Sequence, residues 1–525
     1  MRTRGRGRRT TTSLVGLGLW LAIRPAVAGE PGEGSPSAPP RVMMEPGEVV
    51  EVVDSFDDDD PFDISISLGF QYTAKEARIL RESSLNQPGL TTGGYTASTM
   101  NVAEYAEQIS RLVPGLDLGL YKDFAFHFRV PIVLSSARRL DALGGNEGLL
   151  PFVLAGAPGE TLFALPFVSP ERSGPEYLAM GLNLDIFNQA RDHTKPTWLL
   201  GAEVRLGVGE PLHPCNSAPP AGQVECADPG DVNRNGESDI NDPSLKGAGG
   251  PLEAASLKER GAGYTRGMVG LEAHTLMSKR IKYVEPYGGF AALFDFPLLN
   301  ADYDITDVQG ALVNAPPIVG TVTVGMMVHP WENREKFGRL TFNLRFDGEY
   351  HSAGRDGSEL FDALGSSSAR SLRDPKWASY KDNCPENPKA ACPCQGTTCP
   401  PKSVVDTGSQ KVYFTGLTLV EAYGSYRARA SVSWQANEYF KINAGGGLRF
   451  EQAHGITHEQ ACNPNFKSDI GASGPCHTGD PMKTEISATG IPNPNYRPSI
   501  DAVGRRFYVD ESRTFEVFAN GVLMF

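Results

Sequence analysis

The chain has 525 residues, of which 40% are hydrophobic, with a mean hydropathy of −0.28 and a formal net charge of −13. The surplus of acidic groups disfavours nucleic acid as a partner. Beyond the N-terminal region no segment offers the run of about 18 apolar residues that a membrane-spanning helix needs, which excludes helical membrane proteins.

Residues 1–28 have the three parts of a secretory signal peptide. A basic stretch is followed by an apolar run at 13–23, and the small residues Ala26, Val27 and Ala28 form a cleavage site before Gly29. The apolar run is too short to span a bilayer, so cleavage is expected rather than anchoring. The signal carries six Arg and no acid, so the mature chain has a charge of −13 − 6 = −19, which suits a surface bathed in divalent cations.

Residues 29–61 are rich in Gly, Pro, Glu and Ser and end in the aspartate run 57–60. This composition predicts a disordered acidic arm. The alternative is that its short valine-rich stretch, residues 48–53, docks inside a lumen of the folded part as a plug.

From residue 62 to the end, apolar and polar residues alternate with a period of two, which is typical of strands with one apolar face. The first run is 62–73 and the last is 513–525, and between them five pairs of runs are each joined by a short turn. Together they predict twelve strands. The connections between pairs are long and polar, at 82–101, 137–175, 210–262, 297–316, 353–411 and 454–504.

Aromatic residues flank the short turns, and the chain stops on Phe525 at the end of an alternating strand. The flanking residues are Tyr121, Phe124, Trp198, Tyr283, Trp331, Phe337, Trp434 and Tyr439. The pattern resembles bacterial outer-membrane β-barrels, in which aromatic girdles mark the interfaces and every second connection is long. No particular porin subfamily is indicated.

This resemblance implies an all-β, antiparallel transmembrane barrel of about twelve strands over residues 62–525, in the bacterial cell outer membrane. Short turns would face the periplasm together with both termini and the acidic arm, and long loops would be extracellular. Outer-membrane lipid would surround the barrel. The terminal Phe525 would be part of the signal read by the barrel-assembly machinery.

Charged residues of both signs occupy the polar faces of the strands. A basic side chain facing lipid would cost roughly 2–4 kcal/mol near the midplane, so these residues are expected to line the interior. The residues expected to line a pore are His127, Arg129, Glu203, Arg205, Arg345, Asp347, Arg427, Arg429 and Arg449. The alternative is a salt-bridge lattice that fills the lumen and passes nothing.

Two features favour the pore. The arginines of the late strands, Arg345, Arg427, Arg429 and Arg449, predict a basic ladder on one wall that faces acids on the other. Many small residues share the polar faces: Ser65, Ser67, Gly69, Gly201, Gly207, Thr321, Thr323, Gly325, Gly445 and Gly447. Although His127 and His274 raise the possibility of a barrel hydrolase, no His is paired with a nucleophile in a recognisable motif, and no enzyme is predicted.

The long loop 210–262 contains a pattern of oxygen-bearing residues that resembles an EF-hand or dockerin-type calcium loop. Ligands at loop positions 1, 3, 5, 7, 9 and 12 would be Asp231, Asn233, Asn235, Glu237 (through its carbonyl), Asp239 and Asp242, with Gly236 at the sharp turn. Position 12 is Asp rather than Glu, and the flanks do not look helical. We expect weak Ca²⁺ binding; a flexible acidic loop is the alternative.

All eight cysteines lie in the long connections: Cys215, Cys226, Cys384, Cys392, Cys394, Cys399, Cys462 and Cys476. An even number in an exported chain favours disulfide bonds within each loop. The prediction is Cys215–Cys226, Cys462–Cys476, and pairing of the other four among themselves; zinc at 384–399 is the alternative.

The sequence therefore predicts a porin-like channel that passes small polar solutes, and it leaves open whether copies of the chain associate as a homo-oligomer. The alternatives are a calcium-dependent surface binding or adhesion protein, a structural barrel and, less favoured, a barrel hydrolase.

Overall fold

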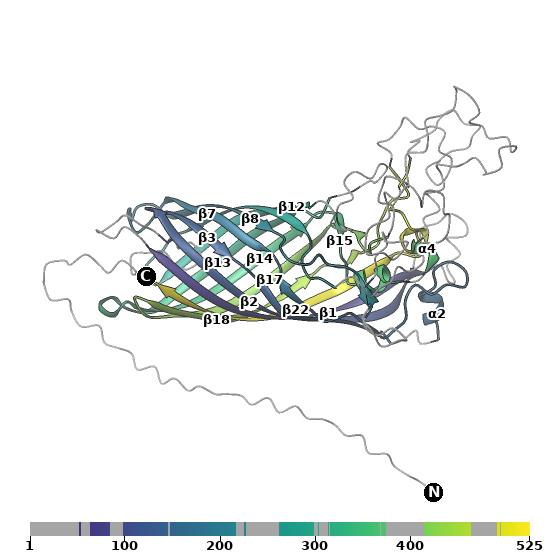
Figure 1. Cartoon of the computed structure of the whole chain (residues 1–525). Coiled ribbons are helices and arrows are strands. Elements are labelled where there is room, and N and C mark those ends of the chain that lie inside the picture. Colours follow the sequence, from purple (N-terminus) through teal and green to yellow (C-terminus); the bar gives the residue numbers. More distant parts are fainter. Residues whose placement is uncertain are drawn as a thin grey trace, which may run out of the picture. The chain divides into compact units, whose positions relative to one another are not determined.

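A closed antiparallel β-barrel of twelve strands forms the body of the protein, as the computed structural model shows (Figure 1). The structure describes residues 52–53, 63–83, 98–144, 148–216, 225–226, 262–298, 303, 313, 315–367, 369–373, 414–463, 491–493 and 495–525. All of them belong to the unit Pro40–Phe525. The signal peptide at 1–28 and the arm at 29–61, except for residues 52–53, lie outside the described residues.

The barrel strands follow one another around the ring mainly as neighbours in sequence. They are β1 (Ile64–Ser83), β2 (Ser98–Tyr121), β3 (Phe124–Arg129), β7 (Leu178–Phe187), β8 (Thr197–Leu206), β11 (Met268–Ser278), β12 (Val284–Pro297), β13 (Val319–Asn333), β14 (Gly338–His351), β17 (Tyr423–Asn437), β18 (Phe440–Glu451) and β22 (Phe507–Met524). The ring closes because β1 pairs with both β2 and β22, with Ser65 opposite Met524. The expected all-β barrel is confirmed.

Large apolar side chains cover the outer face of these strands. Leu68, Phe290 and Leu344 are 55%, 64% and 56% exposed, and similar residues recur at every second position around the ring. A belt of this size does not stay in water, and it matches the lipid-facing band of outer-membrane barrels. The protein is therefore an outer-membrane β-barrel, and its lipid surroundings follow from this belt.

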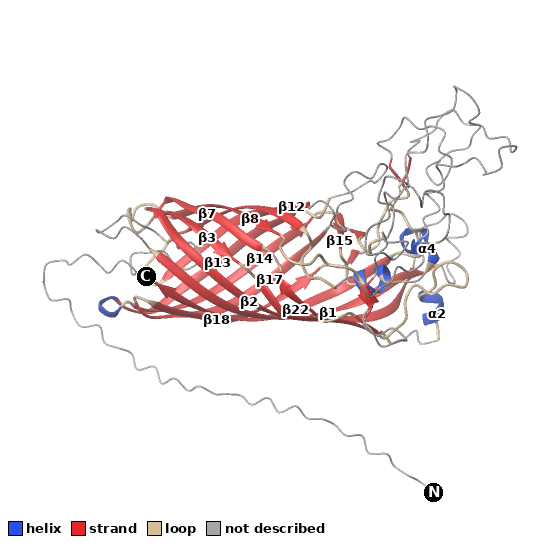
Figure 2. Cartoon of the chain, in the orientation of Figure 1, coloured by secondary structure: helices blue, strands red, loops and turns tan. Residues whose placement is uncertain are grey.

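The short turns gather at the end of the barrel that carries Phe525 (Figure 2). Three turn residues that are not glycine, Lys122, Lys282 and Phe337, adopt φ values of 46°, 56° and 50° to reverse the chain tightly. The exposed aromatics Tyr121, Tyr283, Trp331, Trp434 and Tyr439 flank these turns, as an interfacial girdle would. The turn between β13 and β14 is the 3₁₀ turn η3 (Arg334–Lys336).

One barrel strand is interrupted after β3. Pro131 has no N–H to donate, and the chain resumes as β4 (Ile132–Ala142), which pairs with β2 on one side and with β6 (Arg172–Pro175) and β5 (Phe167–Val168) on the other. Residues 137–142, which the sequence assigned to a long loop, therefore belong to a strand. In β1 the outward-facing residues change from Phe70 to Glu76 and Arg78, which indicates that the strands extend beyond the bilayer on the extracellular side.

Short elements of the long connections lie at that extracellular end, where Figure 2 shows helices beside the strand ends. They are α2 (Leu150–Val153), β9 (Cys215–Asn216), β10 (Glu225–Cys226), β15 (Gly354–Asp356), α3 (Phe361–Gly365), α4 (Arg370–Arg373), β16 (Thr418–Val420), β19 (His454–Gly455), β20 (Cys462–Asn463), β21 (Ile491–Pro492) and α5 (Pro498–Asp501). Among the described residues no helix is long and apolar enough to span a bilayer.

The extracellular end is filled by a cap, which we define as residues 149–167, 357–367, 369–373 and 495–504. The apolar side chains of the cap pack against the inner face of the strands at their extracellular ends. This core contains Ala77, Ile79, Val102, Ala103, Tyr105 and Leu140 of the wall and, among others, Val153, Leu162, Phe163, Leu360, Leu364, Leu372, Ile500 and Phe507. Phe361 of α3 packs in a second cluster with Met268 of β11. α3 therefore lies between two clusters, since Ala363 and Leu364 belong to the first and Phe361 to the second.

Candidate functional site: the polar interior of the barrel

The period-two alternation of each strand places the expected pore-lining residues on the inner face. Arg345 and Asp347 of β14 alternate with the outward Leu344 and Phe346, and Arg427 and Arg429 of β17 lie beside them in the ladder. Arg449 on β18 is opposite Arg427. His127, Arg129, Glu203 and Arg205 occupy the inner faces of β3 and β8. These residues therefore lie on the inner faces of their strands, and that they line a pore stays a prediction.

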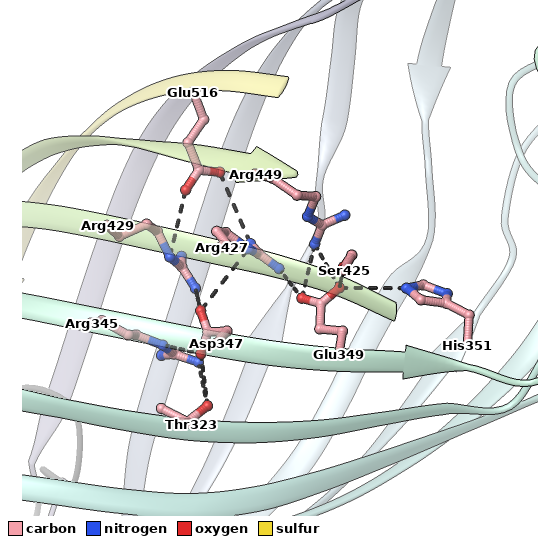
Figure 3. Close-up of polar contacts among 10 residues, drawn as sticks. All are labelled: Thr323, Arg345, Asp347, Glu349, His351, Ser425, Arg427, Arg429, Arg449 and Glu516. Carbon is pink, nitrogen blue, oxygen red and sulfur yellow. Dashed lines mark hydrogen bonds and ion pairs between the residues drawn. The ribbon is translucent and has the colours of Figure 1, made fainter. Parts of the chain in front are cut away.

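On one wall, β14, β17, β18 and β22 hold a lattice of arginines and carboxylates (Figure 3). Asp347 accepts hydrogen bonds from Arg345 Nε at 2.6 Å, Arg429 Nη2 at 3.0 Å and Thr323 Oγ1 at 2.7 Å. Glu349 accepts from Arg449 Nη2 at 2.9 Å and from Arg427 Nη2. Asp347 and Glu349 therefore each accept hydrogen bonds from two arginine side chains.

Exposure separates the two signs of charge in this lattice. The side chains of Arg345, Arg429 and Arg449 are 28%, 25% and 27% exposed, whereas those of Asp347 and Glu349 are 1% and 7% exposed. Glu516, which lies 3.5 Å from Arg429 Nε, is 8% exposed. The acids thus lie beneath the arginines, and the surface that this wall presents to the lumen is basic.

The arrangement differs from the ladder expected from the sequence, in which the acids faced the arginines across the lumen. Here the acids that pair with the arginines belong to the same wall. The cross-strand register explains this, since Asp347 lies opposite Arg427 and Arg345 opposite Arg429. Side chains two positions apart on one face can then reach each other directly.

The wall of β3, β7, β8 and β11 carries a second polar group. His127 Nε2 lies 3.0 Å from Glu203 Oε2, and Glu203 Oε1 accepts from Arg205 Nε at 2.6 Å. Arg205 also donates to Glu272, and His274 Nε2 lies 3.2 Å from Asn183 Oδ1. This wall therefore contains acids, but they are paired with Arg205 and with histidines.

The expectation that small inward residues leave open space is met only in part. Built Cβ atoms on Gly201, Gly325, Gly445 and Gly447 would approach large side chains, His274, Tyr287, Phe518 and Arg429, at 2.1, 2.3, 2.8 and 2.6 Å. A large side chain from a neighbouring residue packs over each of these glycines, so they do not border open space. Ser65, Ser67 and Gly69, in contrast, do border an open cavity.

This cavity of about 520 Å³ lies in the half of the barrel nearer the short turns. Its charged lining residues are Asp117, Arg129, Arg345, Arg429 and Lys441. Asparagines and serines of several strands complete its polar surface, and Val113, Phe518, Val522 and Met524 contribute apolar surface. Its volume falls within the range of small-molecule sites in proteins.

Val52 and Val53 also border the cavity. Val52 is 7% exposed and packs with Ala125 and Leu199, and Val53 and Leu276 join this cluster. Ala125 and Leu199 face the lumen, so two residues of the segment assigned to the acidic arm lie inside the barrel. The rest of residues 29–61 lies outside the described residues, and the plug stays a prediction.

Two buried arginines tie the cap to the barrel. Arg81 of β1 is 3% exposed and donates to the carbonyls of Val153, Ala155 (2.9 Å) and Arg505 (2.8 Å). Burial, together with the nearby Arg505, lowers the pKa of Arg81 to about 9, so Arg81 stays charged at neutral pH. Arg172 of β6 makes a bidentate pair with Asp362 of α3, at 2.6 and 3.0 Å.

A third tie depends on pH. Glu82 accepts from Arg506 Nη2 at 2.7 Å, from Tyr508 Oη at 2.8 Å and from the Gly504 N–H at 2.8 Å. Burial alone would raise the pKa of Glu82, but these hydrogen bonds outweigh it and lower the pKa. The cap is therefore stabilised by an ionised Glu82.

His329 contacts an acid and a hydroxyl group, which are the residue types of a hydrolase site. His329 lies 3.3 Å from Glu285 and 2.9 Å from Thr341 Oγ1. His329 and Glu285 are 0% exposed and Thr341 is 3% exposed. Such burial indicates a structural network.

The predicted calcium ligands, Asp231, Asn233, Asn235, Glu237, Asp239 and Asp242, lie outside the described residues. So do Cys384, Cys392, Cys394, Cys399 and Cys476. Strand pairing of β9 with β10 puts Cys215 opposite Cys226, the partner predicted for it. Cys462 pairs in register with Pro492, and its predicted partner lies outside the described residues.

No protein-family model and no curated protein matches the chain. Solved structures similar to it include an outer membrane channel from Pseudomonas putida F1, 8% identical with a TM-score of 0.33 over 92% of this chain and 99% of that one. A FadL homologue from Pseudomonas aeruginosa is 7% identical, with a TM-score of 0.30 over 88% and 90%. The outer membrane protease OmpT from Escherichia coli is 8% identical, with a TM-score of 0.24 over 90% and 98%. At these values the similarities carry no argument about what this chain does.

Proposed function

We propose that this protein is an outer-membrane channel for small polar solutes. The observation that carries the proposal is the cavity of about 520 Å³ in the barrel interior, bordered by charged and amide side chains from many strands. A barrel that served only as a scaffold gains nothing from desolvating charges around a space of this size. A passage for polar solutes needs such a surface, because it replaces water around the solute.

The cap gives this channel a gate. α3 lies at the extracellular mouth and is held by the apolar residues of both clusters and by the Arg172–Asp362 pair. A solute enters when the cap moves. The resting chain is therefore expected to conduct little, and loosening the cap is expected to raise its conductance.

A closed structural barrel is the second candidate, and the paired charges together with the apolar core of the cap favour it. A planar bilayer distinguishes the two. Wild type and a cap variant, Asp362→Ala, are each inserted and their single-channel conductance is recorded in KCl. Conductance that increases in the variant supports the channel, and silence in both forms supports the structural barrel.

The remaining expectations extend this proposal. Weak Ca²⁺ binding in the loop 210–262 would make that loop a surface site, with adhesion as a possible additional role. Phe525, which follows β22, is proposed as part of the signal for the barrel-assembly machinery. Association into a homo-oligomer is likewise a proposal. No catalytic role is proposed for the interior histidines.

A further inference from the structure

We infer that the interior cavity is a binding site for a small organic anion, a carboxylate that carries a short apolar group. This inference rests on the proposed channel and names the class of solute that it would select. It follows from three properties of the described lining: its charge, its hydrogen-bond donors, and its apolar side chains.

Positive charge dominates the lining. Arg129, Arg345, Arg429 and Lys441 border the cavity with a single acid, Asp117. Arg345 and Arg429 share the carboxylate of Asp347, which is 1% exposed and lies behind them. Glu516 also lies 3.5 Å from Arg429 Nε. The whole lattice therefore pairs four guanidiniums (Arg345, Arg427, Arg429 and Arg449) with three carboxylates (Asp347, Glu349 and Glu516), which leaves one positive charge in excess on its more exposed arginine surface. Arginine suits a carboxylate because its planar N–H groups match the two carboxylate oxygens.

Amide groups add donors to this surface. Asn343 accepts a hydrogen bond from Tyr287 Oη at 2.8 Å through its Oδ1 atom. Asn183 places its Oδ1 atom 3.2 Å from His274 Nε2. In both residues the oxygen is engaged with the barrel, and the amide nitrogen is the atom that remains to donate to a solute. Because these N–H groups can donate to the oxygen atoms of a solute, they favour binding of an anion over a cation.

Apolar side chains also border the cavity. Val52 packs with Ala125 of β3 and Leu199 of β8, and Val113, Phe518, Val522 and Met524 add apolar surface on β2 and β22. A solute in the cavity meets guanidiniums and apolar side chains together. The site therefore fits an anion with an apolar end better than an inorganic ion.

Calorimetry on the full chain in detergent at pH 7 tests this inference with three probes of similar size, butanoate, butanamide and butylamine. Butanoate is expected to bind saturably and roughly tenfold or more tightly than either other probe. Acetate, which lacks the apolar end, is expected to bind more weakly than butanoate. Equal binding of butanoate and butanamide would overturn the inference.

Single variants locate the site. Arg345→Gln and Arg429→Gln each leave Asp347 with the other guanidinium, and each is expected to weaken butanoate binding roughly tenfold. Arg429→Lys keeps the positive charge and is expected to retain part of the affinity for butanoate. It serves as a control for a folding defect at this position. Arg139→Gln is the matched control, because Arg139 pairs with Asp141 on the exposed surface of β4. Unchanged binding in both Gln variants would overturn the site.

Conductance of the same samples separates this inference from the proposed function. Conductance without preference for butanoate refutes the anion site and leaves the channel. Butanoate binding that is lost in the Gln variants, in a barrel that never conducts, supports the site and refutes the channel.

Discussion

The salt bridge between Arg172 and Asp362 is the contact whose loss should open the mouth of the barrel. Both side chains are buried, at 1% and 6% exposure, and Asp362 also accepts from the Cys215 N–H at 2.9 Å. Asp362→Ala leaves the Arg172 charge buried without its carboxylate. Removing one member of a buried pair costs about 3–5 kcal/mol.

That cost falls on the cap rather than on the barrel, because the barrel ladders do not depend on α3. Each 1.4 kcal/mol changes an equilibrium about tenfold, so the population of the open cap should rise by roughly 10² to 10⁴. Hydrogen exchange of the α3 amides measures this population, since local opening controls exchange. Exchange in β14 and β17 should stay unchanged.

Two further variants identify the cause. Replacing both partners, as Arg172→Met with Asp362→Leu, removes the charge and should recover most of the protection, because an apolar pair of similar size is often neutral or stabilising. Asp141→Ala breaks the exposed Arg139–Asp141 pair and should cost about 0–1 kcal/mol. Wild-type exchange of α3 in Asp362→Ala would refute the assignment of this pair as the tie of the cap.

Three other predictions concern the cap, the arm and the calcium loop. Since the pKa of Glu82 is lowered from about 4.5, its stabilisation of the cap is present above pH 4.5 and is lost as pH falls through the lowered pKa. Burial and Glu459 raise the pKa of Asp501, so protonation of Asp501 affects the stability of the cap with the opposite sign. The measured quantity is therefore the difference in acid-induced proteolysis of the cap between wild type and Glu82→Gln, and no difference would contradict the role of Glu82. Deleting residues 29–61 removes Val52 and Val53 from the lumen and should raise the conductance of an Asp362→Ala barrel, whereas an unchanged value would show that the valines do not obstruct it. Calorimetry should detect Ca²⁺ binding at roughly 10⁻⁴–10⁻³ M that is lost in Asp231→Ala, and the absence of calcium-dependent heat would remove the site.

The barrel could be predicted from the sequence because alternation is a local property. The alternation of apolar and charged residues assigns Leu344 and Phe346 to one face of the strand and Arg345 and Asp347 to the other. The charged face must be the inner one, because an arginine that faced lipid would cost too much free energy. The aromatic residues beside short turns fixed the periplasmic end in the same way. These inferences required no knowledge of which strand pairs with which.

Other features depend on contacts distant in sequence. The pairing of Arg429 with Asp347 follows from the register of β14 and β17, which alternation does not define. Gly201 looked like open space because the side chain that covers it, His274, comes from another strand. Counting the small inward-facing residues in the sequence therefore overestimates the free volume inside the barrel.

The cap was missed because long polar connections suggest solvent-exposed loops. A signal was nevertheless present in two short apolar runs within those connections, 149–154 and 360–364. Apolar residues of this density in a loop need a partner to cover them. The mouth of the barrel provides it, which explains why Leu162, Leu360 and Leu364 are almost fully buried.

The central claim, that the polar interior conducts small solutes with preference for anions, is tested most directly by the reversal potential of single channels under a KCl gradient. Asp362→Ala provides the open form, and Arg429→Glu in the same background reverses one charge beside the cavity. We predict a reversal potential that indicates anion selectivity in the first protein and a shift toward cations in the second. A barrel that stays silent with the cap released, or a selectivity that Arg429→Glu leaves unchanged, would contradict the account.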